Sequence, residues 1–104
     1  MTPRITIITV CYNAEQTISR TLRSIQAQTY SNIEYLIIDG ASKDGTLEFV
    51  QKLAPRAKVF SEPDKGIYDA MNKGLKHATG EYIWYVNAGD ALPAPSTVEE
   101  LVKV

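Results

Sequence analysis

The sequence predicts an α/β domain in which a doubly wound, mostly parallel sheet carries helices on both faces. Two observations support this prediction: short runs rich in β-branched residues alternate with amphipathic segments, and the first two runs are apolar at adjacent positions. Such alternation favours parallel strands joined by helices, and nearly continuous apolar strands are typical of a sheet covered on both faces. Right-handed crossovers make the doubly wound arrangement the default.

The first strand and helix come from residues 5–28. Residues 5–11 (ITIITVC) are β-branched and nearly continuous, which predicts a strand. Residues 14–28 predict a helix because their apolar side chains recur at helical spacing. These side chains are Ile18, Leu22 and Ile25. Asn13, with Gln16 three residues later, has the spacing of a capping box and is expected to cap this helix.

A second strand, a second helix and a weak third strand follow. Residues 33–39 (IEYLIID) read as a buried strand, and residues 46–53 as a short helix. The expected inner face of this helix consists of Leu47, Val50 and Leu53. Residues 58–61 (KVFS) predict a short strand, less apolar than the others.

The last part of the chain predicts a third helix, a fourth strand and a final short helix. Residues 66–78 are helical in pattern, residues 81–86 (EYIWYV) are strand-like, and Ser96 is expected to cap a helix through Val102. The apolar stripe of the third helix consists of Ile67, Met71 and Leu75, with Ala70, Gly74 and Ala78 beside it. Glycine is unfavourable in the middle of a helix, so we interpret Gly74 as a position of close packing between helix and sheet. The outer edge of the fourth strand is expected to be unpaired, which invites self-association.

Composition excludes several classes of protein. With 104 residues, 11 Lys+Arg and 12 Asp+Glu, the chain is one small domain of net charge −1. Because positive and negative charges nearly balance, the chain has no excess of positive charge to attract nucleic acid or an anionic membrane surface. No apolar run approaches the ~20 residues of a membrane span, and the N-terminus lacks the pattern of a secretory signal. A single cysteine, Cys11, excludes an internal disulfide, so the expected location is the cytoplasm.

Polar segments follow all four predicted strands, at the edge of the sheet where such folds bind ligands. These segments are CYNAE, DGASKDGT, EPDKG and NAGD. They contain neither the G-x-G-x-x-G of a dinucleotide site nor the G-x-x-x-x-G-K-[ST] of a P-loop. A receiver-type signalling domain would need an acidic pair after the first strand, where this chain has Cys11-Tyr12-Asn13.

Two long segments, TVCYNAEQTISRTLRSIQAQTYSNIEYLIIDGASKDGT and SEPDKGIYDAMNKGLKHATGEYIWYVNAGD, resemble family 2 glycosyltransferases with the GT-A fold. The closest resemblance is to the bacterial subgroup that assembles O-antigen, capsule or exopolysaccharide. It implies that the chain is the Rossmann-like half of an inverting enzyme, the half that binds the nucleotide sugar. The implied reaction moves a hexose from a nucleoside-diphosphate sugar, expected to be of UDP type, to a saccharide or lipid-linked acceptor. It also leaves open that the full-length enzyme associates peripherally with the inner face of the cell membrane.

The resemblance implies donor-binding roles for residues after the first strand. There the family frames the base and ribose, which implies this role for Thr9, Cys11 and Tyr12. Tyr12 can lie against the nucleotide or pack at the start of the helix. Glu15 can contact the sugar, or favour the helix through its dipole.

The resemblance assigns further donor contacts to two acids and a lysine. Asp39 is implied to accept a hydrogen bond from a uracil-type ring N–H, and its alternative is a turn acid that binds local amides. Asp44 can contact the base or ribose, or cap the second helix. Lys65 can provide positive charge for a diphosphate, or remain a solvated surface residue.

The resemblance also implies a divalent cation, Mg²⁺ or Mn²⁺, held after the fourth strand by the D-x-D element. This chain has Asn87, Ala88, Gly89 and Asp90 there, so Asp90 is the implied metal ligand and the other three contact the donor. Asn87 can supply a neutral oxygen to a metal-bound water or a ribose. These assignments require Asp39 and Asp90 to converge on one pocket.

Some features depart from the family pattern. The family often has a second acid where this chain has Gly40, and a glycine where it has Ala41. No catalytic base is assigned, because the family places it beyond the D-x-D region, so residues 1–104 are expected to be the donor-binding portion with the acceptor-binding portion absent. The alternative is a non-catalytic nucleotide-binding or interaction module with a degenerate GT-A fold.

Overall fold

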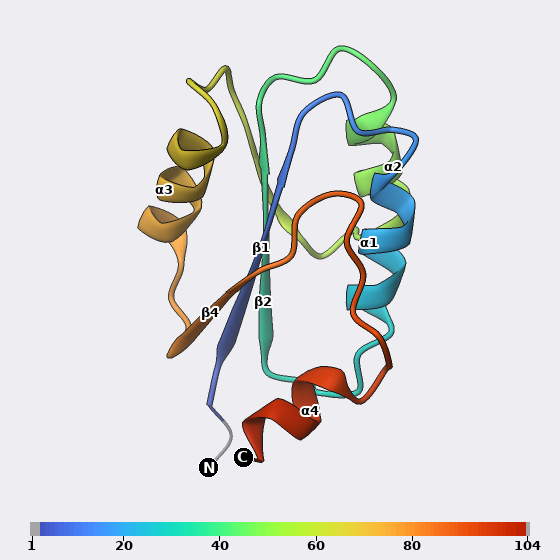
Figure 1. The fold of residues 1–104 in the computed structure, drawn as a ribbon, viewed down its shortest axis with the longest axis vertical. Coiled ribbons are helices and arrows are strands. Elements are labelled where there is room, and N and C mark those ends of the chain that lie inside the picture. The colour runs from blue at the N-terminus through green and yellow to red at the C-terminus, as the bar shows by residue number, and fades with distance from the viewer. Residues whose placement is uncertain (1–2, 104) are drawn as a thin grey trace.

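The computed structural model describes residues 3–103 and contains the predicted alternation of strands and helices (Figure 1). The elements are β1 (Ile5–Cys11), α1 (Ile18–Gln26), β2 (Ile33–Asp39), α2 (Thr46–Leu53), β3 (Lys58–Ser61), α3 (Ile67–His77), β4 (Tyr82–Tyr85) and α4 (Thr97–Val102). The first helix begins at Ile18, later than the predicted residue 14, because residues 14–17 form a turn.

All strand pairs in the sheet are parallel, and the strand order is β3-β2-β1-β4. The register places Cys11 beside Asp39 and Asp39 beside Ser61. The chain builds the sheet outward from β1 to β3 and then returns to the other side of β1 for β4. The carboxyl ends of β1 and β4 therefore form the switch point where ligands bind in such folds.

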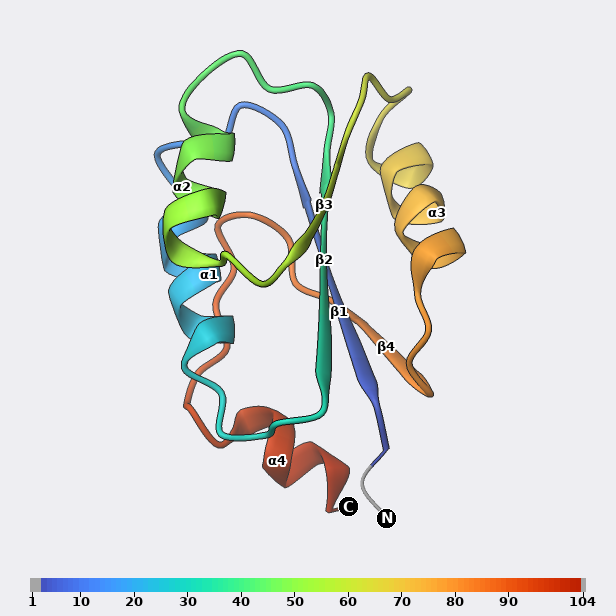
Figure 2. The same ribbon diagram turned by 180° about the vertical axis from the view of Figure 1, so that it is seen from behind.

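Helices cover both faces of the sheet, as predicted. Helices α1 and α2 lie on one face and α3 on the other (Figures 1 and 2). The larger core lies under α1 and α2 and contains Ile7, Ile37 and Leu22, whereas the smaller one lies under α3 and contains Ile8 and Leu36. The apolar faces of β1 and β2 are thus buried on both sides.

The apolar stripe of α3 is not its buried side, and the close packing expected at Gly74 is confirmed. Ile67 and Leu75 are 50% and 49% exposed, whereas Ala70 and Gly74 are buried against the sheet. A Cβ on Gly74 would lie 2.8 Å from the Ile8 side chain, so the helix approaches the sheet too closely for a larger residue. Small residues face the sheet here because they permit this approach.

The predicted inner face of α2 is partly wrong. Val50 is buried and Leu53 packs against the core as expected, but Leu47 lies outside the core cluster and Phe49 packs there instead. Thr46 completes the buried side of the helix.

The predicted helix caps do not form as side-chain hydrogen bonds. The residue before α1 is Thr17 rather than Asn13, and Ser96 stands at the N-cap of α4 without a capping bond from its side chain. Asn13 instead adopts a left-handed conformation (φ 46°), and its side chain contacts another loop.

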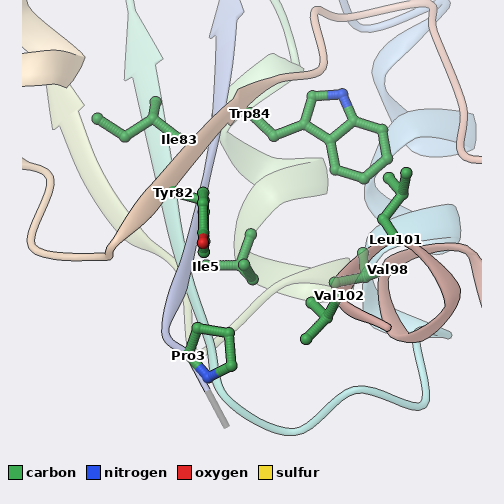
Figure 3. Close-up of a pocket in the computed structure, with 8 residues that line it drawn as sticks. All are labelled: Pro3, Ile5, Tyr82, Ile83, Trp84, Val98, Leu101 and Val102. Atoms are coloured by element: carbon green, nitrogen blue, oxygen red, sulfur yellow. The ribbon is translucent and has the colours of Figure 1, made fainter. Parts of the chain in front are cut away.

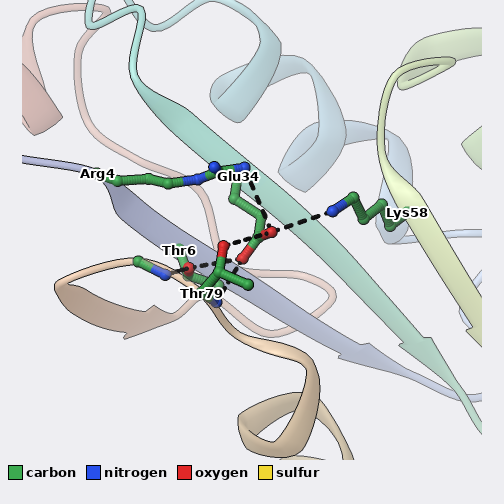
Figure 4. Close-up of polar contacts among 6 residues, drawn as sticks. Arg4, Thr6, Glu34, Lys58 and Thr79 are labelled. Atoms are coloured by element: carbon green, nitrogen blue, oxygen red, sulfur yellow. Dashed lines mark hydrogen bonds and ion pairs between the residues drawn. The ribbon is translucent and has the colours of Figure 1, made fainter.

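A buried carboxylate ties the strands together at the amino end of the sheet (Figure 4). Glu34 accepts hydrogen bonds from the Thr6 hydroxyl (2.9 Å) and from the backbone amide and hydroxyl of Thr79 (2.8 and 2.9 Å). Arg4 and Lys58 pair with its outer oxygen. Burial alone would raise the pKa of Glu34, but these hydrogen bonds lower it to about 2.

An apolar groove of about 450 Å³ lies between β4 and α4 (Figure 3). Its lining includes Trp84, Val98 and Leu101. As expected, β4 is an edge of the sheet; the resulting self-association remains a prediction. None of the helices within residues 3–103 is long and apolar enough to cross a lipid bilayer.

Candidate nucleotide-binding cleft

A second cleft, of about 520 Å³, lies at the switch point between the carboxyl ends of β1 and β4. Three segments form it: the end of β1 with the loop before α1, the loop before α3, and the loop after β4. The lining residues are Val10, Cys11, Tyr12, Asn13, Ala14, Thr17, Asp64, Gly66, Ile67, Asn87 and Ala88. Unlike the groove beside α4, this cleft brings together polar side chains and backbone from several loops.

Four of the predicted site residues line this cleft: Cys11, Tyr12, Asn87 and Ala88. Tyr12 is 60% exposed, so its ring is available to a ligand. Burial raises the pKa of Cys11, and the neighbouring Asp39 carboxylate raises it further, so the thiol stays protonated.

Thr9 lies at the end of β1 and joins it to β2 and to the residue that follows β4. Its hydroxyl donates to the Val86 carbonyl (2.7 Å) and therefore accepts from the Tyr35 hydroxyl (2.6 Å). Burial raises the pKa of Tyr35, which keeps the phenol protonated for this bond. Thr9 is fully buried, so its contribution in this structure is to hold the switch point together.

Asp39 is also fully buried, behind Cys11 rather than in the cleft. Its Oδ1 accepts from the Ser42 hydroxyl and from the Cys11 thiol (3.4 Å). Its Oδ2 accepts from the Ser42 backbone amide (2.9 Å) and from the Ser61 hydroxyl (2.8 Å). Four donors occupy the roughly four acceptor positions of a carboxylate.

Glu15 and Asp44 bind the loops that flank the cleft to each other. Glu15 Oε2 accepts from the Gly45 amide (3.0 Å), and Asp44 Oδ2 accepts from the Glu15 amide (3.3 Å). Asp44 Oδ1 accepts from the amide of Thr46 (3.0 Å), and the Thr46 hydroxyl bond to the same oxygen lowers the pKa of Asp44. The start of α2 thus uses Asp44 locally, and a nucleotide contact by either acid remains a prediction.

The same two loops are joined by polar groups of Asn13 and Ser42. The Asn13 amide donates to the Ser42 hydroxyl (2.8 Å), and the Lys43 amide donates to Asn13 Oδ1 (2.8 Å). The Ser42 hydroxyl therefore connects the Asn13 backbone to Asp39. Sequence patterns mark these as turn residues and do not reveal that the turns bind each other.

A buried threonine on α1 anchors the turn after β4. The Thr21 hydroxyl accepts from the Gly89 amide (2.9 Å) and donates to the Asp90 carbonyl (2.5 Å). Gly89 needs the left-handed region that glycine adopts without strain (φ 99°). The bond directs the Asp90 backbone toward α1, and Asp90 is exposed outside the cleft lining. Neither Asp39 nor Asp90 therefore lines this cleft, although the sequence-based assignments require both acids in one pocket.

Asn87 has a buried side-chain acceptor without a hydrogen-bond partner. Its Oδ1 is the one buried side-chain nitrogen or oxygen without a hydrogen-bond partner in residues 3–103. Buried polar atoms are rarely left unpaired, because this costs about 1–3 kcal/mol. The residue lines the cleft, so this buried acceptor lies next to a space that a ligand can occupy.

The metal-ligand set that the protein itself offers is small. Within the described part of the chain, no three His, Cys, Asp or Glu side chains gather closely enough to hold a metal ion. Asn87 and Asp90 offer hard oxygen atoms, which suit Mg²⁺ or Mn²⁺. The chemistry of these oxygens suits a cation that takes further ligands from phosphate, and metal binding by the two residues remains a prediction.

Lys65 precedes α3 and is exposed. Its amide donates to Asp69 Oδ2 (2.9 Å), and this bond, together with the charges of Lys73 and Lys65, lowers the pKa of Asp69. A diphosphate contact by this lysine remains a prediction.

Three residues of the site were not identified from the sequence. Thr21 and Ser61 support the loops around the cleft through hydrogen bonds, and Asp64 lies in the cleft wall.

Comparison with known proteins gives consistent matches. Residues 6–104 match the family model described as glycosyl transferase family 2. An uncharacterized glycosyltransferase of Mycobacterium tuberculosis is 36% identical over 103 residues, which cover 97% of this chain and 39% of that protein. A PGL/p-HBAD biosynthesis glycosyltransferase of Mycobacterium bovis is 34% identical over 100 residues, covering 92% of this chain and 39% of that protein.

A solved structure also resembles the fold closely. The mannosyltransferase PcManGT from Pyrobaculum calidifontis, in complex with GDP-Man and Mn²⁺, is 33% identical with a TM-score of 0.89. The match covers 99% of this chain and 32% of that chain. The present chain thus spans 39% of the length of each of these two curated relatives.

Proposed function

This chain belongs to glycosyl transferase family 2, and from that premise we propose that the cleft between β1 and β4 binds the nucleoside diphosphate of a sugar donor. The sheet is the Rossmann-like sheet of GT-A glycosyltransferases. The observation that carries the proposal is the orphaned Asn87 Oδ1 in a cleft at the switch point, where folds of this kind bind nucleotides.

Each wall of the cleft has a part in this proposal. The exposed Tyr12 ring offers a flat apolar surface to the nucleoside, and Asn87 Oδ1 accepts from a ribose hydroxyl or a metal-bound water. Lys65, before α3, offers positive charge to the diphosphate. Thr9 and Thr21 hold the two strand ends in place beneath the ligand.

Asn87 and Asp90 are the residues that would hold the divalent cation. When bound, the ion neutralises charge on the departing diphosphate. A single carboxylate binds a free ion weakly, so the proposal has the cation enter with the nucleotide. PcManGT was solved with Mn²⁺ and a nucleotide sugar, which supports this pairing.

We extend the proposal to the whole enzyme. The donor is proposed to be a UDP-hexose, transferred with inversion to a saccharide or lipid-linked acceptor during cell-surface polysaccharide synthesis in the cytoplasm. The printed name of the Mycobacterium bovis relative places that protein in PGL/p-HBAD biosynthesis. The present chain is proposed to supply donor and metal binding without turnover by itself.

Calorimetric titration tests the proposal. UDP and GDP are titrated into the protein with and without Mn²⁺, and into Asp90→Asn, with Glu100→Gln as the control for loss of an exposed charge. We expect Mn²⁺ to strengthen binding of at least one nucleotide in the wild type and in Glu100→Gln, but much less in Asp90→Asn. Absence of binding to both nucleotides under all conditions would refute the proposal.

A further inference from the structure

A row of polar side chains along α1 binds the backbone of residues 89–98, the segment that leads from the turn after β4 to α4. Figures 1 and 2 show this segment running beside α1. The polar row consists of Thr21 and Ser24 on α1 and Gln28 two residues beyond its end. Residues three and four positions apart lie on the same side of a helix, so the three side chains meet one segment together.

Ser24 holds the segment on the C-terminal side of Asp90. Its hydroxyl donates to the Thr21 carbonyl (2.8 Å) and accepts from the Leu92 amide (3.1 Å). Leu92 is itself buried in the core that lies under α1. Thr21 binds the Gly89 amide on the other side of Asp90, so the chain is fixed on both sides of this acid.

Gln28 fixes the far end of the segment with both ends of its side-chain amide. Nε2 donates to the carbonyls of Ser24 and Ala94 (2.9 Å each), which uses both of its N–H groups. Oε1 accepts from the Val98 amide (3.0 Å), in the first turn of α4. Amides in the first turn of a helix have no carbonyl partner within it, so this bond also supports the start of α4.

The turn that contains both proposed cation ligands leads into this held segment. The Asp90 amide donates to the Asn87 carbonyl (2.9 Å), so the two residues are the first and last of one four-residue turn. Asn87 lines the cleft, and the Asp90 side chain is exposed. A carboxylate binds a cation more tightly when the backbone that carries it is already in place, because less conformational freedom is lost on binding.

We propose that Ser24 and Gln28 are positioning residues for the divalent cation, because they hold residues 89–98 and thereby fix where the Asp90 carboxylate stands. Neither side chain contacts the cation, since each acts through the backbone of the segment. This inference rests on the proposed function and deepens it. Loss of either side chain lowers the gain in nucleotide affinity that Mn²⁺ provides and leaves the affinity without Mn²⁺ nearly unchanged.

Calorimetry with UDP and GDP, each with and without Mn²⁺, measures this gain. Ser24→Ala removes the hydroxyl, and Gln28→Glu keeps the shape of the side chain but presents a carboxylate to two carbonyl oxygens. We expect each variant to reduce the gain from Mn²⁺ at least about threefold and to change the affinity without Mn²⁺ less than about twofold. Ser24→Thr keeps a hydroxyl at this position and should retain the gain.

Two controls separate positioning from a general loss of stability. Thr29→Val removes an exposed hydroxyl next to the polar row, but the Thr29 backbone amide still donates to the Pro95 carbonyl (2.9 Å). Val50→Ala leaves a cavity in the core under α2 and lowers the free energy of unfolding without removing any bond of the polar row. Both controls should retain the gain from Mn²⁺.

Hydrogen exchange shows whether each variant has released the segment. The Leu92 amide in Ser24→Ala and the Val98 amide in Gln28→Glu should exchange at least about threefold faster than in the wild type.

Several results would overturn the inference and leave nucleotide binding intact. These are faster exchange with an unchanged gain from Mn²⁺, unchanged exchange, or a loss of the gain in Val50→Ala as well. A wild type that binds nucleotide without any gain from Mn²⁺ would overturn the inference together with the proposed cation. If the wild type binds neither nucleotide under any condition, the inference and the proposed function fail together.

Discussion

Replacing Glu34 by glutamine should destabilise the protein strongly at neutral pH. The Glu34 side chain is 1% exposed, and its pKa is lowered from 4.5 to about 2. Arg4 and Lys58 are about half exposed, so these ion pairs contribute little, and the bonds from Thr6 and Thr79 dominate. A shift from 4.5 to about 2 corresponds to a stabilisation of about 3 kcal/mol at pH 7.

The sign of the pH dependence follows from this lowered pKa. The ionised form is favoured in the folded state, so the stabilisation is present above the unfolded pKa of 4.5 and disappears as pH falls toward 2. At pH 3 about 1.4 kcal/mol should remain. The free energy of unfolding of Glu34→Gln should therefore lie about 3 kcal/mol below the wild-type value at pH 7 and approach it on acidification.

Urea denaturation at pH 7 and pH 3 measures both values. Glu81→Gln is the matched control, because Glu81 is exposed and its side chain has no partner in the described part of the chain. The control should change stability by less than about 0.5 kcal/mol. A Glu34→Gln effect below about 1 kcal/mol at pH 7, or one that does not change with pH, would refute the reasoning.

Two further predictions concern the loops of the cleft. Ala41 adopts a left-handed conformation (φ 63°), so Ala41→Gly should raise the free energy of unfolding by roughly 0.5–1 kcal/mol. Ala78 is at an extended position, so Ala78→Gly should lower the free energy of unfolding. Urea denaturation that ranks the two variants the other way would contradict this. Thr21→Val removes the hydroxyl that holds the Gly89 turn, so the affinity for nucleotide with Mn²⁺, measured by calorimetry, should weaken at least about threefold. The control Thr29→Val should leave this affinity unchanged. Equal affinity in the two variants would contradict the anchoring role of Thr21.

The strands and their direction were predictable because each depends on a local pattern. Residues 5–11 and 33–39 are apolar at adjacent positions and rich in β-branched residues, which is typical of a strand covered on both faces. The packing of α3 was predictable only in part, because the mid-helix Gly74 indicates close packing against the sheet but the apolar stripe does not show which side is buried. Its apolar periodicity pointed to Ile67 and Leu75, but the close approach of Gly74 to Ile8 turned the small residues inward. Helical periodicity identifies a face without showing which neighbour permits close contact.

The candidate site was also predictable only in part. The sequence correctly placed polar residues after each strand, and four of those it named line the cleft. Whether a given acid faces a ligand depends on partners from distant segments. Ser42 and Ser61 take the acceptors of Asp39, whereas Asp64 keeps one unpaired. The spacing of residues in the sequence does not show which hydrogen-bond donors reach which acid.

The central claim, that a nucleotide and a cation meet at the carboxyl ends of β1 and β4, is tested most directly by paramagnetic broadening. Amide spectra of the ¹⁵N-labelled protein are recorded with a nucleoside diphosphate, first with Mg²⁺ and then with a trace of Mn²⁺. The account predicts that the amides of Asn87, Ala88 and Asp90 broaden with Mn²⁺ and that those of Tyr12 and Gly66 shift with nucleotide. Broadening centred on Thr79 or on the groove beside α4, or no response at all, would contradict it.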